Sequence, residues 1–152
     1  MANDDDDRIV KTVDLSAPVA RVWKALTDHN EFGTWFRVRL NGPFEVGRLV
    51  TGIVTYPEYE GLAWHALVER MEHERLFAFS WHPFDVEPET DVSDEPRTLV
   101  EFRLEPTPAG TRLTITESGF SAIPDPRRLE ALRSNRRGWE IQSRNIADHV
   151  AS

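Results

Sequence analysis

The stretch from residue 9 to 36, IVKTVDLSAPVARVWKALTDHNEFGTWF, constrains the fold more than any other part of the chain. Residues 9–15 alternate in a way that indicates a β-strand, although the two faces are not cleanly separated. Ser16 or Ala17 can start a helix with Pro18 in its first turn, where the missing N–H costs no hydrogen bond. That helix is indicated by one apolar stripe made of Val19, Val22, Trp23 and Leu26.

A second short helix follows, with Asn30 as its expected cap and with the aromatic residues Phe32, Trp35 and Phe36. From Arg37 onward the apolar period changes to two, which is typical of strands. Short connections at residues 72–74 and 106–110 predict hairpins, so the sheet should be largely antiparallel. Six further strands are predicted, at residues 38–40, 47–56, 62–71, 75–81, 98–104 and 111–120.

A long final helix is predicted for residues 127–150, after Pro124 and Pro126. Its apolar anchors recur every seven residues, at Leu132, Trp139 and Ile146. The order is then one strand, two short helices, six strands and a long helix. We therefore expect an α+β fold, in which a curved antiparallel sheet of six or seven strands wraps around the long C-terminal helix.

Length and composition favour one globular domain at residues 9–150, preceded by an acidic flexible tail at residues 1–8. The formal net charge of -8 argues against a nucleic-acid partner, which needs clustered Lys and Arg. No apolar run has the roughly 20 residues of a membrane span or the core of a signal peptide, so no membrane association and a cytoplasmic location are expected. The chain has no Cys, which excludes disulfides and thiol chemistry.

Four segments together resemble the START-like superfamily, and within it the branch named after the activator of Hsp90 ATPase. They are the opening stretch, the turn at residues 42–47, the two hairpin sequences LVERMEHERLFAFSW and TLVEFRLEPTPAGTRLTITESGF, and Gly138-Trp139 in the last helix. In the turn, Arg48 replaces the second glycine of the family pattern. The resemblance implies a helix-grip fold with a cavity between sheet and last helix. Many relatives bind an apolar small molecule there, and some carry out cyclisation or hydrolysis.

Strand alternation predicts which side chains face this cavity. An inner wall this rich in aromatic residues suits a flat or ring-bearing ligand, although the same residues could simply fill a core. Gln142 lies on or near the apolar stripe of the last helix, where it could meet a ligand's oxygen atoms or only reflect a shifted helix axis. The predicted ligand-binding residues are Trp35, Trp64, Phe77, Phe79, Trp81, Phe102, Ile115, Glu117, Trp139, Gln142 and Ile146.

Glu117 is the sharpest single candidate, because its parity with Leu113 and Ile115 points it into the cavity. A carboxylate in an apolar cavity has a raised pKa and can act as an acid, a base or a hydrogen-bond anchor. Two other arrangements remain open: a bulge before Gly119 that turns the side chain to solvent, or a salt bridge to an Arg of the last helix.

The sequence carries no other catalytic pattern. The five His residues lack the spacing of a metal site, so no metal and no cofactor are expected. Residues 82–97, with three Pro and six acidic side chains, predict a long exposed loop, whose part 85–95 could dock a basic partner. The leading interpretation is a binding protein for a small apolar ligand, as a monomer or homodimer. The alternatives are an interaction module for a chaperone or other protein, and an enzyme of cyclase or hydrolase type.

Overall fold

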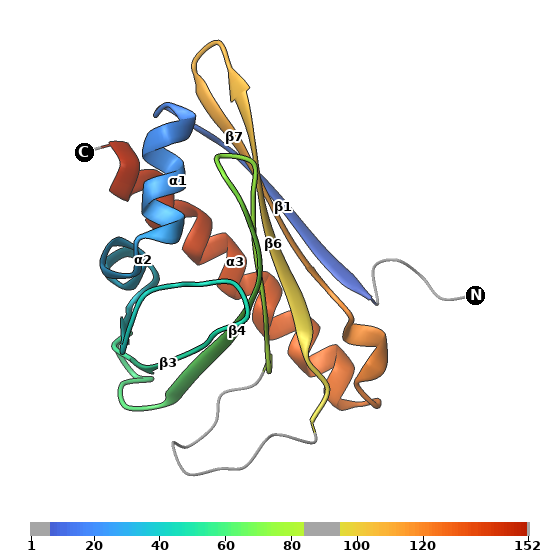
Figure 1. Ribbon diagram of the computed structural model, residues 1–152. Coiled ribbons are helices and arrows are strands. Elements are labelled where there is room, and N and C mark those ends of the chain that lie inside the picture. The colour runs from blue at the N-terminus through green and yellow to red at the C-terminus, as the bar shows by residue number, and fades with distance from the viewer. Residues whose placement is uncertain (1–6, 84–94, 152) are drawn as a thin grey trace.

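The structure, a computed structural model, describes residues 7–83 and 95–151. It contains one seven-stranded sheet with its helices packed on one face, and α3 crosses that face diagonally (Figure 1). In chain order the elements are β1 (Arg8–Leu15), α1 (Val19–Thr27), α2 (His29–Phe36), β2 (Val38–Leu40), β3 (Leu49–Val54), β4 (Ala63–Glu72), β5 (Leu76–Trp81), β6 (Thr98–Thr107), β7 (Gly110–Ser118), the 3-10 turn η2 (Phe120–Ala122) and α3 (Arg127–Ala151).

All strand pairs are antiparallel, and the order across the sheet is β1-β7-β6-β5-β4-β3-β2. The first strand thus lies beside the last, and Ile9 pairs with Glu117. The two short helices between β1 and β2 contact α3. The fold class predicted from the sequence is confirmed. Among the described helices, none has an apolar stretch long enough to cross a membrane.

Both predicted helix starts need correction. Pro18 does not lie in the first turn of α1 but precedes the helix, with an extended backbone at φ -68° and ψ 158°. The side chain that caps α2 belongs to Asp28 rather than Asn30, because the Asp28 carboxylate accepts hydrogen bonds from the backbone N–H groups of Asn30 and Glu31. A carboxylate suits this position, since it also interacts favourably with the positive end of the helix dipole.

The domain begins earlier than the sequence predicts. Residues 1–6 lie outside the described residues, but Asp7 and Arg8, which were assigned to the acidic tail, are part of the domain. The Asp7 carbonyl oxygen accepts hydrogen bonds from the N–H groups of Gly119 and Phe120, and Arg8 is the first residue of β1. Most of the predicted acidic loop, residues 84–94, also lies outside the described residues.

The core fills the space between the sheet and α3. The inward-facing residues that the sequence predicts on β4 to β7 are buried, among them Trp64, Phe79, Phe102 and Ile115, although β5 is buried on both faces. From the opposite side α3 contributes mainly Leu132, Trp139 and Ile146. Glu117 lies inside this apolar interior with an exposed fraction of 0%.

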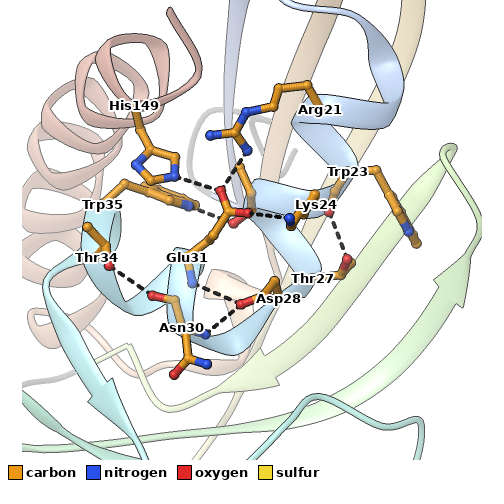
Figure 2. A network of polar contacts seen from close by, with 11 residues as sticks. Arg21, Trp23, Lys24, Thr27, Asp28, Asn30, Glu31, Thr34, Trp35 and His149 are labelled. Carbon is orange, nitrogen blue, oxygen red and sulfur yellow. Dashed lines mark hydrogen bonds and ion pairs between the residues drawn. The ribbon is translucent and has the colours of Figure 1, made fainter. Parts of the chain in front are cut away.

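Glu31 joins the three helices at the end of the core near the C-terminus (Figure 2). Its Oε1 atom lies 2.6 Å from Nη1 of Arg21 in α1 and 2.8 Å from Nε2 of His149 in α3. Burial raises the pKa of Glu31, but the hydrogen bonds and charges of His149 and Arg21 outweigh it, so the net pKa lies below its usual value. Asp28 and Glu31 have the spacing of a capping box, yet the Glu31 side chain serves the neighbouring helices instead.

Candidate functional site

Glu117 sits near the end of β7 on the inner face of the sheet. The strand alternates strictly, so that Leu113, Ile115 and Glu117 are buried together. Its neighbours across the sheet are Ile9 on β1 and Val100 on β6, both buried and apolar. The period of two therefore turns this carboxylate toward α3, as parity predicts, and among the described residues neither a bulge nor an Arg partner occurs at this position.

Four side chains of the described part of the chain donate hydrogen bonds to this carboxylate. Trp139 Nε1 lies 2.8 Å from Oε1, and Trp81 Nε1 lies 2.8 Å from Oε2. Thr98 Oγ1 lies 2.6 Å from Oε2, and Nδ2 of Asn135 lies 3.0 Å from each oxygen. The donors come from both sides of the core, since Trp81 and Thr98 belong to the sheet and Asn135 and Trp139 to α3.

Two opposing effects set the protonation of Glu117. Burial raises its pKa above the usual value, and this is the larger effect, while the hydrogen bonds from Thr98, Trp81, Trp139 and Asn135 lower it. All four partners donate, so the geometry fits a carboxylate that only accepts. None of these four side chains is ionisable. The site is therefore better suited to binding a hydrogen-bond donor than to transferring a proton.

A continuous set of aromatic rings surrounds this polar cluster. The rings of Trp81 and Trp139 are stacked, with centroids 5.8 Å apart and planes at 25°. Trp64 contacts Trp81 edge-on at 6.0 Å, and Phe102 contacts Trp139 edge-on at 5.8 Å. Phe36 joins the set from α2, with its centroid 6.2 Å from that of Trp139. Such offset and edge-on contacts add roughly 0.5–1.5 kcal/mol per pair beyond the buried area.

Two buried polar atoms have no hydrogen-bond partner among the described residues, Nε1 of Trp64 and Nε2 of His82. The indole Nε1 of Trp64 is buried, and no acceptor for it occurs among residues 7–83 and 95–151. The Trp64 ring itself is 8% exposed and contacts the rings of Phe32, Phe36 and Phe79. A buried donor without an acceptor costs about 1–3 kcal/mol, so it marks a place where an acceptor would be stabilising.

The structure brings most of the predicted ligand-binding residues together around Glu117. Trp35 adjoins the ring set through its edge-on contact with Phe36 at 5.5 Å, and its Nε1 already donates to the backbone oxygen of Ala25 at 2.8 Å. Gln142 is occupied as well, since its Nε2 donates to the backbone oxygen of Phe36 at 2.9 Å. Six other predicted ligand-binding residues form or adjoin the ring set, namely Trp64, Phe77, Phe79, Trp81, Phe102 and Trp139. Ile115 and Ile146 are buried in the same core. Ligand contact by any of them stays a prediction.

Sequence reasoning missed Thr98 and Asn135, although each carried a signal. Thr98 shares the inward parity of Val100 and Phe102 on β6. Asn135 precedes Trp139 by four residues, which places the two side chains on the same face of α3. Both were passed over because a Thr and an Asn become informative only when their acceptor is known.

A pair of histidines was also missed. Nε2 of His65 on β4 lies 2.6 Å from Nδ1 of His82, which follows β5, and burial lowers the pKa of both imidazoles. Strand pairing, rather than sequence spacing, brings the two residues together. Within the described ranges no three His, Asp or Glu side chains are close enough to hold a metal ion.

A surface hollow lies elsewhere, between β1 and α3. It is lined by Lys11, Thr12, Val13, Glu140, Ser143, Arg144 and Ala147. None of the predicted ligand-binding residues lines it. Its lining includes three charged side chains and only two apolar ones, Val13 and Ala147, whereas ligand pockets are mostly lined by apolar side chains.

The sheet gripping one long C-terminal helix, with two helices between its first two strands, defines a helix-grip protein of the START-like class. Comparison with family models assigns the chain more narrowly. A model described as "Activator of Hsp90 ATPase homolog 1-like protein" matches residues 16–151, and the chain belongs to this family. Comparison with curated proteins finds no match.

Solved structures agree on the fold. Protein MLL2253 from Mesorhizobium loti is 22% identical, with a TM-score of 0.74, and the match covers 95% of this chain and 96% of that one. A protein from Arthrobacter aurescens is 16% identical, with a TM-score of 0.81 and coverage of 99% and 90%. DynU16, described as a putative protein in the dynemicin biosynthetic locus, is 22% identical with a TM-score of 0.74, and this chain spans 48% of its length. At these identities the similarity establishes the shared fold.

Proposed function

We propose that the protein binds a small hydrophobic or aromatic molecule between the sheet and α3, in the ring set around Glu117. The observation that carries the proposal is the carboxylate itself. Glu117 is fully buried among aromatic rings and yet accepts hydrogen bonds from four neutral side chains. Membership of a helix-grip family supports the same place, since that fold encloses its ligands between sheet and last helix.

Filling of the core alone explains this carboxylate poorly. Removing a carboxylate from water costs several kcal/mol, and an apolar side chain of similar volume would fill the core without that cost. Buried titratable groups with a shifted pKa are enriched at functional sites for this reason. The unpartnered N–H of Trp64 in the adjoining rings adds a second polar group whose position the core alone does not require.

Binding would be driven mainly by apolar area, at about 25 cal/mol for each Å² removed from water. The rings now fill the interior, so the ligand must displace part of them. Orientation would come from Glu117 as hydrogen-bond acceptor. We favour binding over catalysis because all four groups in contact with Glu117 are neutral.

The test uses the indole N–H signals of the five Trp residues in a ¹⁵N–¹H NMR spectrum, assigned by single Trp→Phe variants. Naphthalene serves as the apolar probe, and native mass spectrometry of the gently purified protein searches for a ligand that is already bound. We expect naphthalene to shift the signals of Trp81 and Trp139. Trp23 is the internal control, because its ring lies on α1 against His73 and outside the ring set around Glu117. Unchanged Trp81 and Trp139 signals, together with a protein free of any small molecule, would contradict the proposal.

A second function is favoured by one observation on the other side of the sheet. No described helix covers the outer face (Figure 1), and Val46 and Leu49 beside it are 61% and 50% exposed. Trp64, Trp81 and Trp139 also pack closely, as expected if the interior serves as a core. An Hsp90-type chaperone is the partner that the family description suggests. A Leu49→Glu variant that loses binding to a purified chaperone, with its indole signals unchanged, would support this alternative.

A further inference from the structure

We infer that the ligand of this site is a planar aromatic molecule with an N–H or O–H donor, and that it replaces the indole of Trp81 on Trp139 and Glu117. The inference rests on the proposed function and goes further by naming the chemical class of the ligand. It depends on the contacts of Trp81, on its position in the chain and on the charge of the group it meets.

Trp81 makes the two contacts that such a ligand would make. Its ring stacks on that of Trp139, and its Nε1 donates to Glu117 Oε2 at 2.8 Å. The side chain is a flat ring with one donor on its edge, held between an aromatic face and a carboxylate. The protein thus contains, in its own Trp81, a template for the shape and polarity of the molecule that fits there.

Trp81 is also the member of the cluster best placed to move. It is only partly buried and is the last residue of β5, so fewer backbone hydrogen bonds hold it than hold a residue in mid-strand. Trp139 lies in the middle of α3 with 3% of its surface exposed, and Thr98 is 1% exposed. Rotation of the Trp81 side chain toward solvent would leave a flat space beside Trp139 without disturbing either of these residues.

The carboxylate decides which molecules can fill that space. When Trp81 rotates away, Glu117 Oε2 loses one of its hydrogen-bond donors. A ligand without a donor would not replace that hydrogen bond. Hydrogen bonds to buried charged groups are strong enough that restoring one should change affinity about 10-fold or more. A ligand that presents an acceptor to Glu117 would instead be repelled. The free N–H of Trp64, whose ring contacts that of Trp81, could in addition receive an acceptor atom on another edge of the ligand.

The experiment compares indole with benzothiophene, which has nearly the same shape but no N–H group. Both are titrated by calorimetry into the full chain and into its Trp81→Ala variant, with Trp23→Ala as the control that removes a Trp from outside the site. We expect Trp81→Ala to bind indole at least about 10-fold more tightly than benzothiophene. Indole should also raise the unfolding temperature of Trp81→Ala. Its affinity for Trp23→Ala should equal its affinity for the wild-type protein.

The outcomes separate this inference from the proposed function. Equal affinities for indole and benzothiophene in Trp81→Ala would overturn the donor requirement and leave a purely apolar site. If neither indole nor benzothiophene binds Trp81→Ala, and naphthalene does not bind the wild-type chain, the inference and the proposed function are both overturned. If Trp81→Ala does not fold, Trp81→Phe keeps the ring and removes the donor. Indole should then bind Trp81→Phe more tightly than it binds the wild type, and an unchanged affinity would overturn the inference.

Discussion

At the scale of single residues, Glu117 makes the least expected contacts in the molecule. It is a charged group by type, yet it occupies a position that strand alternation assigns to the core, and both sides of the core supply its donors. A hydrogen bond to such a group should contribute more to stability than one to a neutral carbonyl oxygen, because the buried charge gains more from each donor. Two buried Trp residues allow a direct comparison.

Trp139→Phe should lower the free energy of unfolding by about 1.5–3 kcal/mol through its lost hydrogen bond, whereas Trp35→Phe should lose about 0.5–1.5 kcal/mol from this source. Trp139 donates to the Glu117 carboxylate, and Trp35 donates to the backbone oxygen of Ala25 at the same 2.8 Å distance. Each ring is 3% exposed, so the substitutions remove similar apolar area. Chemical denaturation measures both values. Equal losses would show that the charge of Glu117 adds nothing to the hydrogen bond.

The sequence located Glu117 but not its surroundings. Parity along one strand is a local property, and so the inward direction of Glu117 followed directly from Leu113 and Ile115. Thr98, Asn135 and the His65–His82 pair depend on which strands and helix faces meet, and no spacing in a single sequence encodes that. The predicted set was therefore richer in rings than in the polar groups that give the site its chemistry.

At the scale of elements, the two glycines within helices have opposite surroundings. A Cβ atom added to Gly33 in α2 would lie 2.4 Å from the backbone oxygen of Val38. That oxygen belongs to β2, which pairs with β3 and cannot easily move. A Cβ atom added to Gly138 in α3 meets nothing within 4 Å.

We expect Gly138→Ala to raise the free energy of unfolding by about 0.5–1 kcal/mol, because Ala loses less conformational entropy in a helix. Gly33→Ala should lower it by about 1–3 kcal/mol, since the overpacked contact falls on backbone. Thermal unfolding followed by circular dichroism measures the two shifts. The two substitutions serve as controls for each other, because each replaces Gly by Ala within a helix and so changes helix propensity by the same amount. A shift in the same direction for both would contradict the close approach of α2 and β2.

Element boundaries could be predicted less well than element order. Asp28 rather than Asn30 caps α2, and the difference of two residues depends on where α1 ends. Strand β6 was predicted to end at Leu104, because Pro106 is typical of a turn, yet it continues to Thr107. Pro106 lies opposite Thr111 near the hairpin end, where a missing N–H is tolerated. Breaker residues such as Pro indicate roughly where an element ends. Pairing with the neighbouring strand determines which residue is the last.

At the scale of the whole molecule, the buried carboxylate of Glu117 and the half-buried carboxylate of Glu31 give stability opposite dependences on pH. Burial raises the folded-state pKa of Glu117, so the folded protein holds a proton that the unfolded chain has already lost as the pH rises above about 4.5. The contribution of Glu117 is then most favourable at low pH and decreases as the pH rises through this window. Glu31 has a lowered folded-state pKa beside Arg21, Lys24 and His149, so its contribution is present above about pH 4.5 and is lost on acidification.

Unfolding free energies of the wild type, Glu117→Gln and Glu31→Gln across pH 3–8 should show both effects as differences from the wild type. The excess stability of wild type over Glu117→Gln should fall as the pH rises from about 4.5, and its excess over Glu31→Gln should grow through the acid range. All other titrating groups cancel in these differences. If the two stability differences had the same slope against pH, or did not change with pH, the environments assigned to Glu117 and Glu31 would be contradicted.

The burial of Glu117 also has a consequence for how the sheet is assembled. Its four donors lie 36, 19, 18 and 22 residues away in the chain, so the complete set of hydrogen bonds requires β5, β6, β7 and α3 to have met. A slip of β7 by one residue would turn the carboxylate to the outer face, and a slip by two would leave it among rings without these donors. Apolar neighbours such as Leu113 and Ile115 could exchange places at little cost. Glu117 therefore marks one alignment of β7 as correct, and it specifies strand register where apolar residues alone would leave it ambiguous.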